Sequence, residues 1–494
     1  MRLATRLVRN TIAWIRKTVY FDNNATTPLD PNVKKFIASI LSFYGNPSSI
    51  HSSGSRSREL IEWARQQVAG VINASPDEIV LTSGATEANN TVIKTVAAIK
   101  SKGHFITSAI EHPSVLQVHK SLEKKGFPVT YLKVNKSGMI DLTKLTQAIR
   151  PDTVLISIMH VNNEIGSIQP IEEIAQIAQK HSILFHSDIV QSFSKFPINV
   201  KELPVDYLSF SAHKIYGPKG IGGLYVREGR PLEPLIEGGH QEKTLRAGTE
   251  SLFNIAGFGK AAEIARQVDL AVYRNNLLAI KKALYEGIKS VFPDAQINGD
   301  FEQGSPTTLN IFLPGVDNRE FIAFLDFYRI EVSTGSACIS GSDEPSHVLL
   351  ALGLTPEEAL SSFRIGIGRF NTISDAESFI KILHYFISES QDFFDYLFPQ
   401  DLTPAILSNP AMLVVEIRTA AQRKKFKSFP GAIISEISMS ALRKLPKDKS
   451  IILMCEDGYL ANIYALRLKN AGWKNVKAVF GGHRAWRTLY QITE

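Results

Sequence analysis

Apolar segments of strand length alternate with stretches of helical spacing through the first half of the chain, and each apolar segment ends in polar residues. The clearest of these segments are residues 79–82, 104–108, 153–160, 183–188 and 205–211. Strands that alternate with helices are typical of a doubly wound α/β fold with a mainly parallel sheet. Such sheets bind ligands at the carboxyl ends of their strands. The polar residues after these segments therefore predict one shared binding site.

Two of these junctions favour a phosphorylated carbonyl cofactor. Lys214 stands where an apolar strand gives way to a glycine-rich loop, just after Ser211 and His213. Partial burial lowers the pKa of an amine, so such a lysine could form a Schiff base, although the segment alone fits an ordinary surface lysine better. Residues 79–90 run from a strand into a helix and place Thr86 at the helix N-terminus, where phosphates bind.

Together the junctions meet the needs of pyridoxal phosphate (PLP), which are a Schiff-base lysine, a phosphate seat, an acid on the pyridine nitrogen and a cover for the ring. Lys214 meets the first need, and Asp188 at a strand end meets the third. His112 at another strand end could stack on the ring and shuttle protons, as a catalytic residue. The residues alone also leave open that Asp188 caps a helix and that His112 is a core histidine. The predicted phosphate seat consists of Ala85, Thr86, Ser211 and His213.

Residues 18–395 resemble the cysteine desulfurases of the NifS/IscS group, which have the class V aminotransferase fold. The matching motifs, in chain order, are Tyr-Phe-Asp-Asn-Asn-Ala-Thr-Thr-Pro, Gly-Asn-Pro-Ser-Ser, Thr-Ser-Gly-Ala-Thr-Glu, Met-His-Val-Asn-Asn-Glu-Ile-Gly, Ser-Ala-His-Lys-Ile-Tyr-Gly-Pro-Lys-Gly, Arg-Ala-Gly-Thr, Ser-Thr-Gly-Ser-Ala-Cys and Ser-Ser-Phe-Arg-Ile-Gly-Ile-Gly-Arg. The resemblance implies a PLP enzyme of fold type I, with a large sheet domain and a smaller α/β domain.

The resemblance also implies a role for each site residue. Asn163 and Arg364 would bind the substrate L-cysteine, Arg364 through a bidentate bond to its carboxylate. The enzyme would be a homodimer in which Thr249 reaches the phosphate of the second subunit. The cofactor would contact Lys214 as a Schiff base, Ala85, Thr86, Ser211 and His213 at the phosphate, Asp188 at the pyridine nitrogen, Gln191 at the ring hydroxyl and His112 above the ring.

Cys338 favours cysteine desulfuration among the reactions of class V PLP enzymes. It lies in a loop of small polar residues, 333–342, an unsuitable place for a buried structural thiol. Its thiolate is expected to attack the sulfur of the substrate, which gives alanine and a Cys338 persulfide. A mobile loop would carry that sulfur to an acceptor, such as an iron–sulfur scaffold or a thiolation protein. A transient iron–sulfur ligand role for Cys338 is left open, and no other metal site is predicted.

Other reactions remain open from the sequence. Selenocysteine lyase, cysteine sulfinate desulfinase and transaminase activities use the same cofactor, and a lapsed scaffold for sulfur-transfer partners is a non-enzymatic alternative. One departure concerns the usual Asp-Ala-Thr-Gln of the family, which is here Asp188-Ile-Val-Gln191. The bulkier pair is expected to reshape the lower face of the ring site.

The C-terminal residues form a second, basic module. Residues 411–494 contain 15 Lys and Arg against 6 Asp and Glu, and they resemble a single rhodanese domain. Cys455 could accept sulfur from Cys338, or the module could serve only for docking. Glu456 and Asp457 beside Cys455 would repel thiosulfate, so we expect poor thiosulfate sulfurtransferase activity. The predicted division is a basic extension (1–18), a PLP domain (19–265), a small domain (266–398), a linker (399–410) and the rhodanese-like domain (411–494).

The small number of cysteines indicates the kind of cellular compartment in which the protein works. Cys338 and Cys455 are the two cysteines of the 494-residue chain, which excludes a disulfide framework and favours a reducing compartment such as the cytoplasm. The basic, acid-free residues 1–18 leave a mitochondrial-type presequence open. No apolar run is long enough to span a membrane. The basic C-terminal face is expected to be a solvated surface, without direct binding of nucleic acid.

Overall fold

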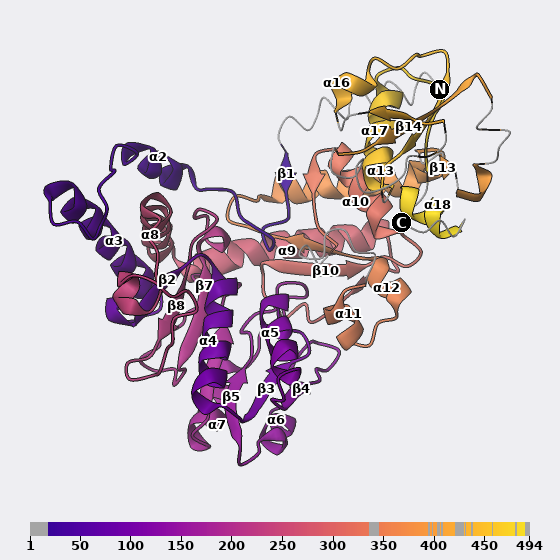
Figure 1. Ribbon diagram of the computed structural model, residues 1–494. Helices are drawn as coiled ribbons and strands as arrows, with labels where there is room; N and C mark the ends of the chain where they lie inside the picture. The colour runs from indigo at the N-terminus through magenta and orange to yellow at the C-terminus, as the bar shows by residue number, and fades with distance from the viewer. Residues whose placement is uncertain are drawn as a thin grey trace.

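The computed structural model describes residues 18–334 and 345–393, and within 396–489 all residues except 398, 403–405, 407–408, 420–428, 430, 436–437, 457 and 480–481. The described chain forms a large α/β domain, a smaller α/β domain beside it and a C-terminal α/β unit next to the small domain (Figure 1). The predicted α/β class is confirmed.

A seven-stranded mixed sheet forms the centre of the large domain. Its strand order is β2-β8-β7-β6-β5-β3-β4, and β8 runs antiparallel to both of its neighbours while the other pairs are parallel. The strands are β2 (Ile79–Thr82), β3 (His104–Ser108), β4 (Val129–Leu132), β5 (Thr153–Ser157), β6 (Leu184–Asp188), β7 (Tyr207–Ser211) and β8 (Gly222–Val226). Only β8 runs in the opposite direction within this sheet, so the carboxyl ends of the other six strands meet at one edge.

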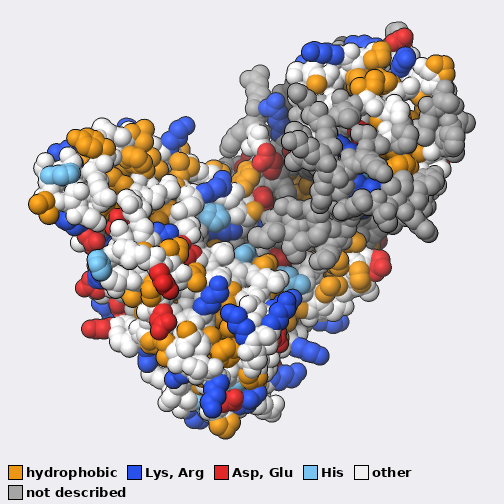
Figure 2. Space-filling view, in the orientation of Figure 1, with side chains coloured by type: hydrophobic (Ala, Val, Ile, Leu, Met, Phe, Trp, Pro, Cys, Tyr) orange, Lys and Arg blue, Asp and Glu red, His pale blue; other side chains and the backbone are white. Residues whose placement is uncertain are grey.

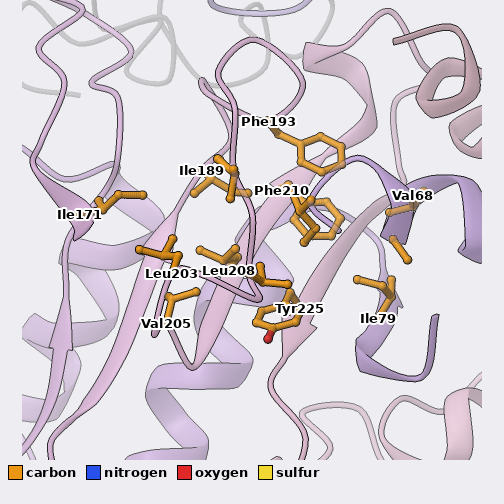
Figure 3. Packing of buried hydrophobic residues seen from close by; sticks show 14 of the residues in the cluster. Val68, Ile79, Ile171, Ile189, Phe193, Leu203, Val205, Leu208, Phe210 and Tyr225 are labelled. Carbon is orange, nitrogen blue, oxygen red and sulfur yellow. The ribbon is translucent and has the colours of Figure 1, made fainter. Parts of the chain in front are cut away.

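The central strands are apolar on both faces because helices cover both faces of the sheet. On β3, Phe105 packs against α4 and α5, whereas Ile106 packs on the opposite face with α3, α7 and α8. On that second face the rings of Phe193 and Phe210 stack with centroids 4.4 Å apart (Figure 3). The helices are α2 (Pro31–Ser39), α3 (Ser52–Gly70), α4 (Ala85–Lys100), α5 (Pro113–Glu123), α6 (Leu142–Ala148), α7 (Ile171–Lys180) and α8 (Leu252–Arg266).

The small domain carries a three-stranded antiparallel sheet in the order β12-β10-β9, packed against long helices. Its elements are α9 (Leu270–Val291), β9 (Gln296–Ile297), β10 (Thr308–Phe312), α10 (Asn318–Phe327), β11 (Ile330–Glu331), α11 (His347–Ala351), α12 (Pro356–Leu360), β12 (Ser362–Gly366) and α13 (Ile373–Phe393). The first strand of the chain, β1 (Val19–Tyr20), pairs with β11, and Phe21 is buried in the core of the small domain. The N-terminal segment from residue 19, which the predicted division assigned to the PLP domain, thus packs with the small domain.

The C-terminal unit is a five-stranded parallel sheet in the order β13-β17-β16-β14-β15. Its elements are β13 (Tyr396–Leu397), β14 (Met412–Ile417), β15 (Ile433–Ser435), α16 (Met439–Leu442), β16 (Ser450–Met454), α17 (Tyr459–Asn470), β17 (Val476–Val479) and α18 (Gly482–Leu489). Helix α17 packs against α10, where Arg467 lies 3.8 Å from the carboxylate of Asp326. Because β13 completes this sheet, the unit starts at about residue 396, upstream of the predicted start at 411.

No helix in the described part of the chain is long and apolar enough to cross a membrane. Helices α2 and α3 project to one side of the large domain (Figure 1).

Candidate active site

A cavity of about 520 Å³ lies at the carboxyl edge of the large sheet and reaches the small domain. Cavities of this size hold cofactors and small substrates. Ten of the thirteen predicted site residues line it, namely Ala85, Thr86, His112, Asn163, Asp188, Gln191, Ser211, His213, Lys214 and Arg364. They meet here because parallel strands end at the same edge and β12 of the small domain faces that edge.

The N-terminus of α4 forms one wall of the cavity. Gly84 caps this helix with φ of +156° and without any side-chain hydrogen bond to the first turn, so backbone N–H groups of the first turn can bind an anion. The neighbouring strand approaches closely, since a Cβ on Gly222 would lie 2.7 Å from Cα of Gly84. Glycine at position 222 therefore permits the close packing of β8 against the start of α4.

Positive charge gathers beside that wall. Burial, together with the smaller effect of the charges of Lys214, Lys219 and Lys195, lowers the pKa of His213 to about 3. Lys195 is buried, and its burial together with Lys214 lowers its own pKa to about 7. A bound anion would relieve this accumulation of cationic groups.

Lys214 is the last residue of the short helical turn that follows β7, and it lines the cavity. Its Nζ donates to the backbone oxygen of Ala25 at 2.8 Å and to that of Asn24. Gln191 also donates to Asn24, from Nε2 at 2.9 Å. The segment after β1 therefore holds both side chains in place.

Asp188 and His112 approach the cavity after two parallel strands, β6 and β3, which are separated in the sheet by β5. The carboxylate of Asp188, at the end of β6, accepts hydrogen bonds from Asn89 Nδ2 at 2.8 Å and from the backbone N–H of Val190 at 3.0 Å. His112 caps α5, and its Nδ1 accepts from the backbone N–H of Ser114 at 3.2 Å. Burial lowers the pKa of His112, and the nearby Asp188 opposes that shift.

Arg364 presents a buried cation to the other side of the cavity. Its side chain is 1 % exposed and pairs with Asp22 at 2.9 Å. A second guanidinium nitrogen donates to the backbone oxygen of Asn163 at 3.0 Å. A guanidinium fixed in this way suits the planar carboxylate of an amino acid.

Three predicted residues lie elsewhere. Thr249 is exposed and does not line the cavity. Cys338 lies outside the described residues. Cys455 is buried after β16 in the C-terminal unit, where its Sγ accepts from the backbone N–H of Ala461 at 3.3 Å. Of the unusual pair after Asp188, Val190 lines the cavity but Ile189 points into the core, so the expected reshaping involves Val190 alone.

Sequence reasoning missed several lining residues. His347 lies at the start of α11, and its Nε2 is 3.0 Å from the backbone oxygen of Glu111. No motif marks His347, although Asn24 and Lys219 lie within motifs and could have been proposed from them. In the described part of the chain, no group of three or more His, Cys, Asp or Glu is arranged to bind a metal ion.

Glu111 is a fully buried carboxyl group directly before His112. Burial raises its pKa from 4.5 to about 8, although bonds from the Ser108 hydroxyl (2.6 Å) and the backbone N–H of Met159 (3.0 Å) oppose the shift. Between pH 4.5 and 8 the folded state keeps this proton while the unfolded state releases it. The contribution of Glu111 to the free energy of unfolding therefore falls as pH rises through this window.

We expect Glu111→Gln to remove this pH dependence, because the amide cannot ionise. The slope of the free energy of unfolding against pH should become more positive by up to about 1.4 kcal/mol per pH unit within the window. Urea unfolding at pH 5, 6, 7 and 8 measures the slope, and Glu123→Gln, an exposed carboxylate on α5, is the control. Parallel slopes for wild type and Glu111→Gln would contradict the assignment.

The geometry of the cavity fits PLP. It combines an anion-binding helix start, a lysine amine, a buried carboxylate and a histidine that can cover the ring, which are the groups that this cofactor requires. Gly84, Ala85 and Thr86 at the start of α4 line the cavity where a phosphate could bind, and Arg364 offers a separate place for a substrate carboxylate.

Comparisons with known proteins agree with this fit. The family described as "Aminotransferase class-V" matches residues 19–379. The cysteine desulfurase IscS of Dictyoglomus turgidum is 45% identical over 379 residues, which is 76% of this chain and 96% of that protein. IscS of Pectobacterium carotovorum is 44% identical over 383 residues, 76% of this chain and 94% of that one.

Solved structures give the same result. A NifS-like protein is 38% identical, with a TM-score of 0.71, and the match covers 75% of this chain and all of that one. A NifS-like protein from Rickettsia africae is 34% identical, with a TM-score of 0.68 and the same coverage.

Proposed function

The chain belongs to the class-V aminotransferase family as a PLP-dependent cysteine desulfurase of the IscS/NifS type, and on that premise we propose which of its residues perform each step. Enzymes of this family take sulfur from L-cysteine and pass it to acceptor proteins. The bound cofactor supplies an aldehyde that combines with amines and a ring that withdraws electrons from the substrate.

Lys214 would hold the cofactor covalently, with its phosphate on the first turn of α4. The uncapped N–H groups at Ala85 and Thr86 and the side chains of Ser211 and His213 are available for this purpose. Asp188 would face the pyridine nitrogen, Gln191 the ring hydroxyl and His112 the upper face of the ring. The observation that carries this assignment is that Lys214, Asp188 and His112 line the same cavity as Arg364.

Arg364 and Asn163 would orient the substrate. Arg364 already faces a carboxylate, that of Asp22, at 2.9 Å, so the incoming carboxylate of L-cysteine would share or displace this contact. Arg364 comes from the small domain and Lys214 from the large domain. The substrate would therefore react only where the two domains meet.

Cys338 would perform the sulfur transfer. Its thiolate attacks the sulfur atom of the substrate, the new S–S bond forms as the Cβ–S bond breaks, and the products are alanine and a Cys338 persulfide. The acceptor that takes this sulfur is an iron–sulfur scaffold, a thiolation protein or Cys455 of the same chain. Free thiols at Cys338 and Cys455 fit a reducing compartment such as the cytoplasm.

The active unit would be a homodimer. Hydrophobic side chains gather on the surface of the projecting α2–α3 arm (Figure 2). Two of them, in the segment between the helices, are unusually exposed: Tyr44 is 86% exposed and Ile50 is 97% exposed. Leu235, Ile236 and Thr249 are exposed in a second segment of the large domain. A second copy that covers these surfaces would bring its own Thr249 to the phosphate.

The C-terminal unit would be a rhodanese-like domain. Its five-stranded parallel sheet, with Cys455 in the turn between β16 and α17, supports this proposal. Arg487 forms an ion pair with Glu456, which neutralises one of the two carboxylates expected to repel anions from Cys455. Sulfur relay and docking both remain compatible with this arrangement.

Persulfide mapping tests the proposal. The PLP-loaded protein is given L-cysteine, alanine is quantified, and mass spectrometry locates the persulfide in wild type, Cys338→Ala and Cys455→Ala. We expect persulfide on Cys338. Persulfide on Cys455 that disappears in Cys338→Ala would establish the relay, and its absence from Cys455 would leave docking as the role of the unit. Alanine formation without any persulfide on Cys338 would contradict the mechanism.

A further inference from the structure

The buried amide of Asn89 joins the two side chains that are proposed to contact the cofactor ring. We infer that Asn89 is a positioning residue. It fixes the positions of Asp188 and His112 relative to each other and, through Ser114, keeps the proton of neutral His112 on Nε2. The inference rests on the proposed roles of Asp188 and His112.

Asn89 lies in the second turn of α4 and is fully buried. Its Nδ2 lies 2.8 Å from Asp188 Oδ2 and 2.9 Å from Ser114 Oγ. These partners come from different elements, the end of β6 and the first turn of α5. An apolar side chain would be the ordinary choice at a buried helix position, because asparagine is a poor helix former and its amide loses hydration there.

The direction of each hydrogen bond follows from its partners. A carboxylate oxygen can only accept, so the side of Asn89 that faces Asp188 must be the amide nitrogen. The second hydrogen of that nitrogen points to Ser114 Oγ, which accepts it. The hydroxyl hydrogen of Ser114 is then directed to His112 Nδ1, 2.8 Å away.

A second donor reaches the same ring nitrogen. The backbone N–H of Ser114 lies 3.2 Å from His112 Nδ1, and a backbone N–H can only donate. Nδ1 therefore accepts, and the proton of the neutral ring is on Nε2. A second proton on Nδ1 would face both donors, so the charged ring is disfavoured by this contact as well as by burial.

The consequence concerns which group can accept a proton during the reaction. With Nδ1 engaged and Nε2 protonated, His112 enters the reaction as a hydrogen-bond donor that covers the ring. The charged or titratable groups near it are Asp188, Lys214 and His347. Among these, the Lys214 amine is the group suited to move protons once the substrate has released it.

The first test measures the affinity of the full-length enzyme for PLP. Asn89→Leu keeps the volume of the side chain and removes both hydrogen bonds, which leaves Asp188 Oδ2 without its donor. We expect the dissociation constant for PLP to rise about ten-fold, the usual effect of losing a hydrogen bond to a charged group. Asn90→Leu is the matched control, because Asn90 is the next residue of α4 and its amide donates to the backbone oxygen of Thr86 at the surface.

The second test reads the proton directly. Histidine-selective ¹⁵N NMR of the deuterated, PLP-bound protein distinguishes a protonated Nε2 from a protonated Nδ1, and His112→Gln identifies the signal. We expect Nε2–H in wild type and a shifted Nδ1 signal in Ser114→Ala, which retains the backbone donor and is expected to fold even if Asn89→Leu does not. A merely structural role for Ser114 would leave this signal unchanged.

Two outcomes would overturn the inference, namely a proton on Nδ1 in wild type, or unchanged PLP affinity in Asn89→Leu. Turnover of L-cysteine by the wild-type protein tests the proposed function separately. A wild-type enzyme that is active but carries the proton on Nδ1 would refute the inference about Asn89 and leave the proposed function intact.

Discussion

Replacing Lys214 with alanine is expected to abolish desulfuration, with a loss of about 10⁴-fold or more, because the variant lacks the amine that holds the cofactor and moves protons beside it. The side chain that is lost occupies a fixed position, since its Nζ donates to the backbone oxygens of Asn24 and Ala25. Two other described lysines lie close to Lys214, but Lys195 is buried and contacts Gln191, and Lys219 lies on the exposed side of the cavity.

The measurement combines alanine formation from L-cysteine with the visible absorption of the PLP-loaded protein. We expect both the activity and the Schiff-base absorption to disappear in Lys214→Ala, whereas Lys201→Ala, an exposed lysine of the same domain, should match wild type. Partial recovery of activity on addition of methylamine would support the role of the amine itself. Wild-type absorption in Lys214→Ala would show that another residue holds the cofactor.

Replacing Cys338 with alanine is expected to lower sulfide release at least about 10³-fold, because no other nucleophile is proposed to attack the sulfur of the substrate. Unlike Lys214→Ala, this variant should bind PLP with wild-type affinity and keep its visible absorption. The difference between the two variants separates loss of the nucleophile from loss of the cofactor.

Cys455→Ala is the matched control, since it removes the second cysteine of the chain and leaves the proposed nucleophile in place. We expect Cys455→Ala to release sulfide at close to the wild-type rate. Unchanged sulfide release from Cys338→Ala would refute attack by this thiolate, even if the enzyme still consumed L-cysteine.

The main features of the site could be predicted because they depend on short-range patterns. Apolar segments ending in polar residues indicated parallel strands, and parallel strands place their carboxyl ends together. Thus Asp188 after β6 and Lys214 after β7 lie at one cavity, although neither position contains information about the other. Arg364 was identified through the family resemblance, since its strand belongs to an antiparallel sheet of the small domain.

The features that the sequence did not reveal depend on long-range contacts. Asn89 looks like a surface residue of α4 next to Asn90, and only the meeting of α4, α5 and β6 buries it. The two-residue strands β1 and β13 carry too little pattern to predict their partners, β11 and β17. The predicted boundaries at residues 19 and 411 differ from the observed units for this reason.

The pairing of β13 with β17 also fixes where the C-terminal unit could be exchanged between proteins. Tyr396 stands three positions after Phe393, the last residue of α13, so the edge strand of the unit directly follows the final helix of the enzyme. A recombination breakpoint at residue 411 would transfer a sheet without this edge and leave the backbone of β17 open to pairing with other chains. A breakpoint just before β13 would transfer all five strands. The exchangeable unit therefore includes β13, although in the sequence this strand looks like the end of the enzyme domain that precedes it.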